Sequence, residues 1–78
     1  MQTRQTKLHG FAVCLRNPGL SASLEVRKLY PIVADADVEA NDLICVIDES
    51  GEDYVYPANL FQRLTLPLEV QRALQMAS

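Results

Sequence analysis

Residues 43–64, LICVIDESGEDYVYPANLFQRL, contain the succession of signals that decides the fold. Five apolar residues precede Asp48, and such a run predicts a strand covered on both faces and the best candidate for the central strand of a sheet. The following ESGED contains Gly51 and predicts a hairpin connection, after which YVY pairs back as a short strand that ends at Pro57. One turn of tight helix at PANL and a short last strand at FQRL complete the series.

Two further strands are predicted upstream. In FAVCLR, residues 11–16, large apolar residues at odd positions alternate with Ala, Cys and Arg at even positions, which predicts a strand with one face on a core. The Pro18-Gly19 pair predicts a reversal of the chain. In LEVRKLYPIV, residues 24–33, the alternation slips after Lys28, and the extra residue predicts a β-bulge around Arg27 and Lys28.

The remaining segments are a loop and a terminal helix. ADADVEAND, residues 34–42, is acidic and short, and we expect a loop with helical character. Residues 67–77 are predicted to form an amphipathic helix, with Pro67 near its first turn and Glu69 near the positive end of the helix dipole. Its apolar stripe consists of Leu66, Val70, Ala73, Leu74 and Ala77.

Five short strands and one closing helix predict a mainly β domain, a small five-stranded antiparallel barrel with a C-terminal amphipathic helix. Residues 1–9 lack periodicity and are expected to form a flexible N-terminal tail, so residues 10–78 make up the single domain. Pro31 cannot donate to a ladder, and that end of its strand is therefore expected at a sheet edge or outside the sheet.

Composition excludes several classes of protein. The 78 residues carry a formal charge of −3, which offers no general attraction to phosphate backbones and makes nucleic acid an improbable partner. The first ten residues lack the apolar core of a secretory signal, and no run approaches the ~20 apolar residues of a membrane span. We therefore expect a cytoplasmic protein without membrane contact, in which Cys14 and Cys45 are reduced core thiols.

The segment DYVYPANLF, with the hairpin GEDYVYP after LICVID and the motif KLYP, resembles Src-homology-3 (SH3) barrels. The resemblance covers roughly residues 24–65 and implies an SH3-like fold. Those domains hold proline-rich peptides between tyrosines, a tryptophan and the proline of a 3₁₀ turn. This chain has no tryptophan, and Leu60 stands where that turn has a tyrosine, so Tyr30 and Pro57 are the matched positions and proline-rich peptides are not the expected ligand.

The longer stretch DESGEDYVYPANLF also resembles segments of small bacterial proteins with which we associate no activity. This second resemblance bears on size and compartment and carries no mechanism.

Two surfaces are candidates for binding a partner. Tyr54 and Tyr56 are two residues apart and share one face of a strand, so either both are displayed or both point inward with hydroxyls that need partners at the rim. The candidate protein-binding residues are Tyr30, Pro31, Tyr54, Tyr56 and Pro57. The alternative, a nucleic-acid-associated barrel, would use Arg16, Arg27 and Lys28.

Two clusters of acidic residues are also candidate sites. Asp35, Asp37, Glu39 and Asp42 suggest a calcium loop, but Ala40 stands where such a loop needs glycine, so a solvated acidic loop is favoured. The hairpin tip holds Asp48, Glu49, Glu52 and Asp53, for which a charged turn is favoured over acid–base chemistry.

Cys14 would need a base to act as a nucleophile, and the single histidine, His9, lies in the predicted tail. We therefore expect neither an enzyme nor a bound cofactor or metal. The favoured function is a non-enzymatic protein-interaction module. A nucleic-acid accessory barrel and a protein that self-associates through helix 67–77 or a sheet edge are the alternatives.

Overall fold

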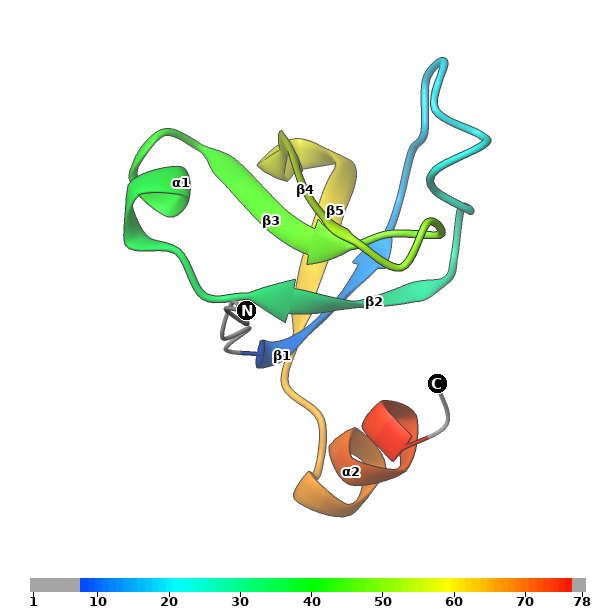
Figure 1. The fold of residues 1–78 in the computed structure, drawn as a ribbon, viewed down its shortest axis with the longest axis vertical. Coiled ribbons are helices and arrows are strands. Elements are labelled where there is room, and N and C mark those ends of the chain that lie inside the picture. The colour runs from blue at the N-terminus through cyan, green and yellow to red at the C-terminus, as the bar shows by residue number, and fades with distance from the viewer. Residues whose placement is uncertain (1–7, 77–78) are drawn as a thin grey trace, which may run out of the picture.

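The computed structural model describes residues 8–76, and within them it contains five strands, two α-helices and a 3₁₀ helix (Figure 1). In chain order these are β1 (Leu8–Cys14), β2 (Leu29–Val33), α1 (Ala36–Ala40), β3 (Leu43–Ile47), β4 (Asp53–Pro57), η1 (Ala58–Leu60), β5 (Phe61–Leu64) and α2 (Leu68–Met76). Residues 1–7 of the expected tail lie outside the described residues, and its last two residues belong to β1.

The strands form one antiparallel sheet in the order β4-β3-β2-β1-β5. The predicted mainly β fold with a C-terminal helix is therefore confirmed. The predicted closed barrel is not formed, because β4 and β5 lie at the two edges and no register joins them within residues 8–76. Pro57 ends β4 and has no N–H with which to begin a ladder toward β5.

β1 contains a bulge that the sequence analysis did not anticipate. Leu8 pairs with Val33 and Phe11 with Pro31, so three residues of β1 advance against two of β2. The extra residue is accommodated at Gly10, whose φ of 89° lies in the left-handed region that favours glycine.

The second bulge is the predicted one. The Arg27 N–H donates to the Cys14 carbonyl at 2.7 Å, and the Cys14 N–H donates to the Lys28 carbonyl at 2.9 Å, so two residues oppose one. Arg27 has φ 72°, which directs residues 24–28 into a turn. The strand expected over residues 24–33 therefore begins only at Leu29.

Two expectations about strand position are wrong. β2, and not β3, is the central strand, and Pro31 consequently lies inside the sheet and not at an edge. The sheet tolerates this proline because β2 pairs with β3 at a single register pair, Ile32 with Val46. The expected burial of β3 on both faces is confirmed, since Ile44, Cys45 and Val46 are all buried.

The inner face of the sheet carries the main core. In β1 it is the face of Ala12 and Cys14 that enters this core, whereas Leu15 beyond the strand is exposed. Leu24 is fully buried there, although it lies in the loop between β1 and β2. The cluster consists of Ala12, Cys14, Leu24, Tyr30, Ile32, Ile44, Val46, Tyr56, Leu60 and Phe61.

The two α-helices lie away from this core. The helical character predicted for residues 34–42 is confirmed by α1, which begins after Asp35 and has no buried residue. α2 lies below the sheet, joined to β5 by residues 65–67 (Figure 1). It starts one residue later than predicted, and the predicted stripe residue Ala77 lies outside the described residues.

The left-handed backbone at Arg27 gives a stability prediction. A side chain in this conformation costs about 1–2 kcal/mol, and glycine loses roughly 0.5–1 kcal/mol more backbone entropy on folding. We therefore expect Arg27→Gly to leave the free energy of unfolding unchanged or raise it by up to about 1.5 kcal/mol. Arg27→Val should lower it by more than about 1 kcal/mol, because β-branched residues are outliers at positive φ. Urea denaturation measures the free energy of unfolding of both variants. Arg63→Val in β5 is the control, because an extended strand tolerates a β-branched residue. Equal stability of the valine and glycine variants would contradict the left-handed backbone conformation at Arg27.

Candidate functional site

The loop between β1 and β2, residues 15–28, is held in one conformation by its own hydrogen bonds. The Asn17 side-chain amide donates to the Leu24 carbonyl at 2.8 Å, and the Leu20 N–H donates to the Asn17 carbonyl at 2.9 Å. The buried side chain of Leu24 anchors the loop in the core. The Glu49 N–H of the β3–β4 hairpin donates to the Ser23 carbonyl at 3.0 Å and ties the loop to that hairpin.

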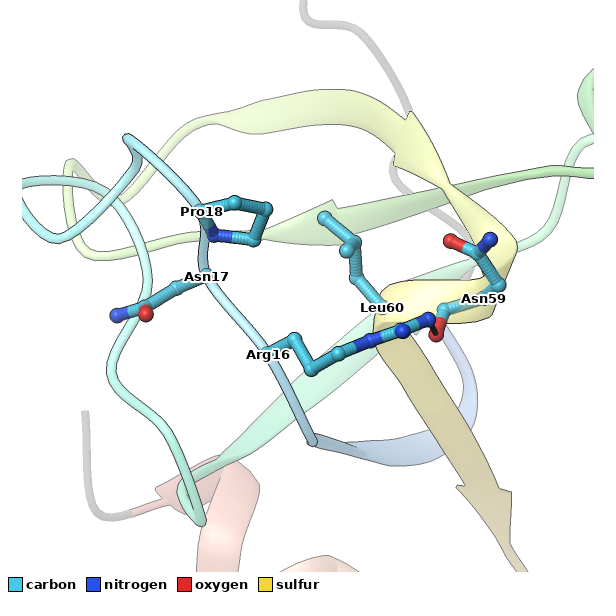
Figure 2. A pocket seen from close by; sticks show the side chains of 5 residues that line it. All are labelled: Arg16, Asn17, Pro18, Asn59 and Leu60. Atoms are coloured by element: carbon cyan, nitrogen blue, oxygen red, sulfur yellow. Dashed lines mark hydrogen bonds between the residues drawn. The ribbon is translucent and has the colours of Figure 1, made fainter.

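The start of this loop lies beside η1, and together they line an open hollow of about 660 Å³ (Figure 2). The Leu15 N–H donates to the Leu60 carbonyl at 2.7 Å, which fixes the loop to η1. Figure 2 shows the Arg16 side chain extended toward η1, and its Nη2 donates to the Asn59 carbonyl at 2.8 Å. The hollow is lined by Arg16, Asn17, Pro18, Asn59 and Leu60.

A second hollow also borders η1. It is lined by Asp42, Pro57, Ala58 and Asn59, and it shares Asn59 with the first. The Ala58 N–H donates to the Asp42 carbonyl at 3.0 Å, so the end of the α1–β3 turn is fixed to η1 as the β1–β2 loop is. We call the combined surface the η1 groove: Arg16, Asn17, Pro18, Asp42, Pro57, Ala58, Asn59 and Leu60.

The η1 groove has opposite charges at its two ends. The Arg16 guanidinium lies at one end and the Asp42 side chain, also exposed, at the other. A guanidinium has five N–H donors, of which the bond to Asn59 uses one. The groove can therefore offer donors at one end, a carboxylate at the other and apolar surface from the exposed Pro18 and Pro57 between them.

Tyr30 does not belong to an exposed surface. Its ring is buried, and its hydroxyl donates to Glu49 Oε2 at 2.5 Å and accepts from the Glu25 N–H at 2.7 Å. Lys28 Nζ lies 2.7 Å from the same carboxylate oxygen and 5.8 Å from the centroid of the Tyr30 ring. The hydrogen bonds from Lys28 and Tyr30 hold the pKa of Glu49 below its usual value, while burial and Glu49 raise the pKa of Tyr30.

Tyr56 is fixed in the same way by the neighbouring carboxylate. Its hydroxyl donates to Asp48 Oδ2 at 2.6 Å, and the other carboxylate oxygen accepts from the Ser50 hydroxyl at 2.5 Å and the Ser50 N–H at 2.9 Å. Burial would raise the pKa of Asp48, but these bonds outweigh it and the pKa is lowered. Burial, and then the bond to Asp48, raise the pKa of Tyr56.

The sequence analysis expected Tyr54 and Tyr56 to be either both exposed or both buried, and in the structure one is exposed and the other is buried. Their rings lie side by side with centroids 6.5 Å apart, yet Tyr56 is 8% exposed and Tyr54 is 53% exposed. Of the predicted protein-binding residues, Tyr30 and Tyr56 are core residues, Pro31 is half-buried, and Tyr54 and Pro57 are exposed. The structure places Pro57 with Arg16, a residue of the alternative nucleic-acid set, around η1.

The other basic candidates lie apart from the η1 groove. Lys28 is paired with Glu49, and the exposed Arg27 occupies the bulge. The sequence analysis did not identify Asn17 and Asn59 as site residues. Their roles depend on hydrogen bonds to main-chain carbonyls, which no sequence pattern predicts.

The acidic residues and the thiol considered as candidate sites have roles in the fold instead. Asp35 is the N-cap of α1, where its Oδ1 accepts from the N–H groups of Asp37 and Val38 at 3.1 and 3.2 Å. Cys14 is fully buried, its thiol donates to the Arg16 carbonyl, and burial raises its pKa. Within residues 8–76, no group of three His, Cys, Asp or Glu side chains is placed to hold a metal ion.

No protein-family model, curated protein or solved structure matches the chain. In the part of the chain that the structure describes, neither α-helix has the length and apolar character needed to cross a membrane.

The bond between Tyr56 and Asp48 gives a second stability prediction. Tyr56→Phe removes the hydroxyl that bonds the buried Asp48 carboxylate and also the Ser23 side chain, and we expect a loss of about 1.5–3 kcal/mol in the free energy of unfolding. Tyr54→Phe is the matched control in the same strand, where an exposed hydroxyl is removed and the change should stay within about 0.5 kcal/mol. Equal effects of the two substitutions in urea denaturation would show that the Asp48 bond does not stabilise the fold.

The two carboxylates also predict a pH dependence. Their pKa values are lower in the folded chain, so their stabilisation is complete above the unfolded values of about 3.9 and 4.3 and is lost as pH falls further. The double variant Asp48→Asn/Glu49→Gln should be less stable than wild type at neutral pH, and this difference should shrink as the pH falls toward about 3. The control Asp37→Asn/Glu52→Gln removes two exposed carboxylates and should retain the wild-type dependence. A difference that stays constant with pH would contradict the prediction.

Proposed function

We propose that this chain is a non-enzymatic protein-interaction module with an SH3-like arrangement of strands, and that it binds an extended peptide segment in the η1 groove. The observation that carries the proposal is the Arg16 guanidinium, held on the Asn59 carbonyl at 2.8 Å in an open hollow between a fixed loop and η1. A side chain already held in place loses less entropy when a partner binds to it.

The rigidity of both walls supports this proposal. One wall is the loop of residues 15–28, anchored by Leu24 and by its bond to Glu49, and the other is η1, bonded to that loop and to Asp42. Loops placed by a rigid scaffold are the common location of binding residues. The SH3-like arrangement is supported by the 3₁₀ turn between the last two strands and by the strand order, although the sheet is open.

The groove favours a partner different from a proline-rich peptide. Tyr30 and Tyr56, which an aromatic-lined groove would display, are buried and bonded to carboxylates. Arg16 and Asp42 at opposite ends instead favour a segment with an acidic side chain near one end and a basic one near the other.

The nucleic-acid alternative has less support. Of its three residues, Lys28 is neutralised by Glu49, and Arg16 lies in a different region, beside η1. Phosphate binding depends on several basic side chains acting together, and its affinity falls steeply with salt. Binding that weakens only slightly with salt would favour the peptide, which pairs with one arginine and one aspartate, whereas binding to a phosphate backbone would weaken steeply.

The test is selection of binders from a random peptide display library, followed by calorimetric titration of a selected peptide. Arg16→Glu should weaken binding about tenfold or more, because it reverses the charge at one end of the groove. Arg72→Glu makes the same change in charge on α2, which does not line the groove, and should leave the affinity unchanged.

The outcome that overturns the proposal is equal affinity of the Arg16→Glu variant and the wild type. If Tyr54→Ala abolishes binding while Arg16→Glu does not, the binding surface is the exposed part of β4 and not the η1 groove.

A further inference from the structure

The outer edge of β5 is largely occupied by hydrogen bonds within the chain. The register of β1 with β5, and the bond that the Leu60 carbonyl accepts at its end, direct the main-chain groups of Phe61 and Arg63 away from β1. The Phe61 N–H donates to the Ala58 carbonyl. The Arg63 carbonyl accepts from the Gln62 side chain at 3.1 Å. An edge whose groups are already bonded is a poor template for another strand.

The ladder between β3 and β4 fixes which main-chain groups of β4 face outward. It continues beyond both strand ends: the Asp48 N–H donates to the Glu52 carbonyl at 3.1 Å, and the Ala58 N–H donates to the Asp42 carbonyl at 3.0 Å. Bonded pairs recur every two residues in an antiparallel ladder, so the even-numbered residues of β4 bond to β3. The N–H and carbonyl of the odd-numbered Val55 therefore face away from β3.

The outer edge of β4 is consequently open at its centre. β4 is an edge strand, and no strand within residues 8–76 lies beyond Val55 to bond its main-chain groups. Val55 is 45% exposed and Tyr54 is 53% exposed. An exposed, unpaired strand edge is a template for pairing with a strand of another chain.

We infer that this edge pairs with the same edge of a second copy of the chain, in an antiparallel dimer whose two-fold axis passes beside Val55. The N–H of each Val55 donates to the carbonyl of the other, so each copy supplies both the donor and the acceptor that the other needs. The two sheets become one continuous sheet. Because Tyr54 and Val55 do not line the η1 groove, the inference goes beyond the proposed function.

The side chains of β4 are complementary to themselves in this register. Residues directly opposite each other lie on the same face of an antiparallel pair, so Val55 packs on Val55 and Tyr54 packs beside Tyr56. Apolar and aromatic cross-strand pairs of this kind stabilise a sheet. Pro57, which has no N–H to donate, lies opposite Asp53 at the end of the paired segment.

The charges beside β4 favour a copy of the same chain as the partner strand. Glu52 and Asp53 make the start of β4 acidic, so the strand opposite must not place carboxylates there. In the two-fold register the opposite residues are Ala58 and Pro57, which are uncharged. The next acidic residue of the other copy, Asp42, lies two strand spacings from Glu52, roughly 10 Å, which is about the Debye length at 0.1 M salt.

The same repulsion selects the register centred on Val55. A shift of two residues would place Asp53 of each copy opposite Val55 of the other. The two Asp53 carboxylates would then be diagonal neighbours about 7–8 Å apart. In the proposed register they are four residues apart along the strands, roughly 14 Å.

Sedimentation equilibrium of the full chain, from micromolar to millimolar concentration, tests the inference. Wild type should form a dimer. Val55→Lys and Val55→Glu should each raise the dimer dissociation constant about tenfold or more, because each variant places like charges opposite each other at the axis. An equimolar mixture of the two variants should restore the dimer, because lysine then lies opposite glutamate. Leu15→Lys changes an equally exposed apolar residue of the β1–β2 loop and should leave dimerisation intact.

Three results overturn the inference: a wild type that remains monomeric at millimolar concentration, single Val55 variants that dimerise as wild type does, or a mixture that dimerises no better than its components. Amide spectra of the Val55 variants should show the wild-type fold, since the side chain is exposed.

A second measurement locates the paired edge. Opposite residues that do not bond to each other have Cα atoms about 4.5 Å apart. In a mixture of isotope-labelled and unlabelled wild-type chains, a nuclear Overhauser effect should therefore join Hα of Tyr54 in one copy to Hα of Tyr56 in the other. A dimer that lacks this signal overturns the inference. Arg16→Glu tests the proposed function alone because it leaves β4 unchanged, so the two proposals can fail separately.

Discussion

The rest of the structure depends on the short connection η1 between the two edge strands. β4 and β5 lie at opposite ends of the strand order, and only Ala58–Leu60 separate them along the chain. In a flat sheet the edges of five strands would be about 19 Å apart, whereas three residues of 3₁₀ helix advance about 6 Å. The sheet must therefore curl until its edges approach each other, even though no ladder closes it.

This curl determines which side chains enter the main core. The inner face is crowded, and β1 contributes the small residues Ala12 and Cys14 to it, while the larger Phe11 is buried outside the main cluster. Leu24 and Leu60 enter the core from a loop and from η1, where they fill space that a curled sheet encloses. The outer face is left with apolar residues that α2 covers in part, so the chain has a closed inner core and an incomplete outer one.

The sequence predicted the elements whose signals are local, and the structure shows why the others escaped. Pro57, Gly51 and the slip of alternation after Lys28 each act within a few residues, and the strand end, hairpin and bulge that they predict are present. The position of Pro31 in the central strand depends on how little β2 pairs with β3, which is a property of two strands together. The orientations of Tyr54 and Tyr56 were undecided, because burial of one and exposure of the other depend on which residue lies nearer Asp48 and the core. The η1 groove joins loops far apart in the sequence, and no short motif contains it.

The adjacent residues Asp48 and Glu49 connect this architecture to the candidate binding surface. Two neighbouring carboxylates invite a catalytic interpretation, but each accepts a hydrogen bond from a different buried tyrosine, and neither has a raised pKa. Asp48 holds Tyr56 of β4, and Glu49 holds Tyr30, Lys28 and, through its own N–H, the β1–β2 loop. The hairpin tip thus fixes the strand that leads into η1 and the loop that faces it. The loop is one wall of the η1 groove and β4 leads into the other, so the charged and aromatic residues that first suggest a ligand site instead stabilise a neighbouring surface. That surface combines main-chain groups, two exposed prolines and one arginine, and it is the surface at which we propose that a partner binds.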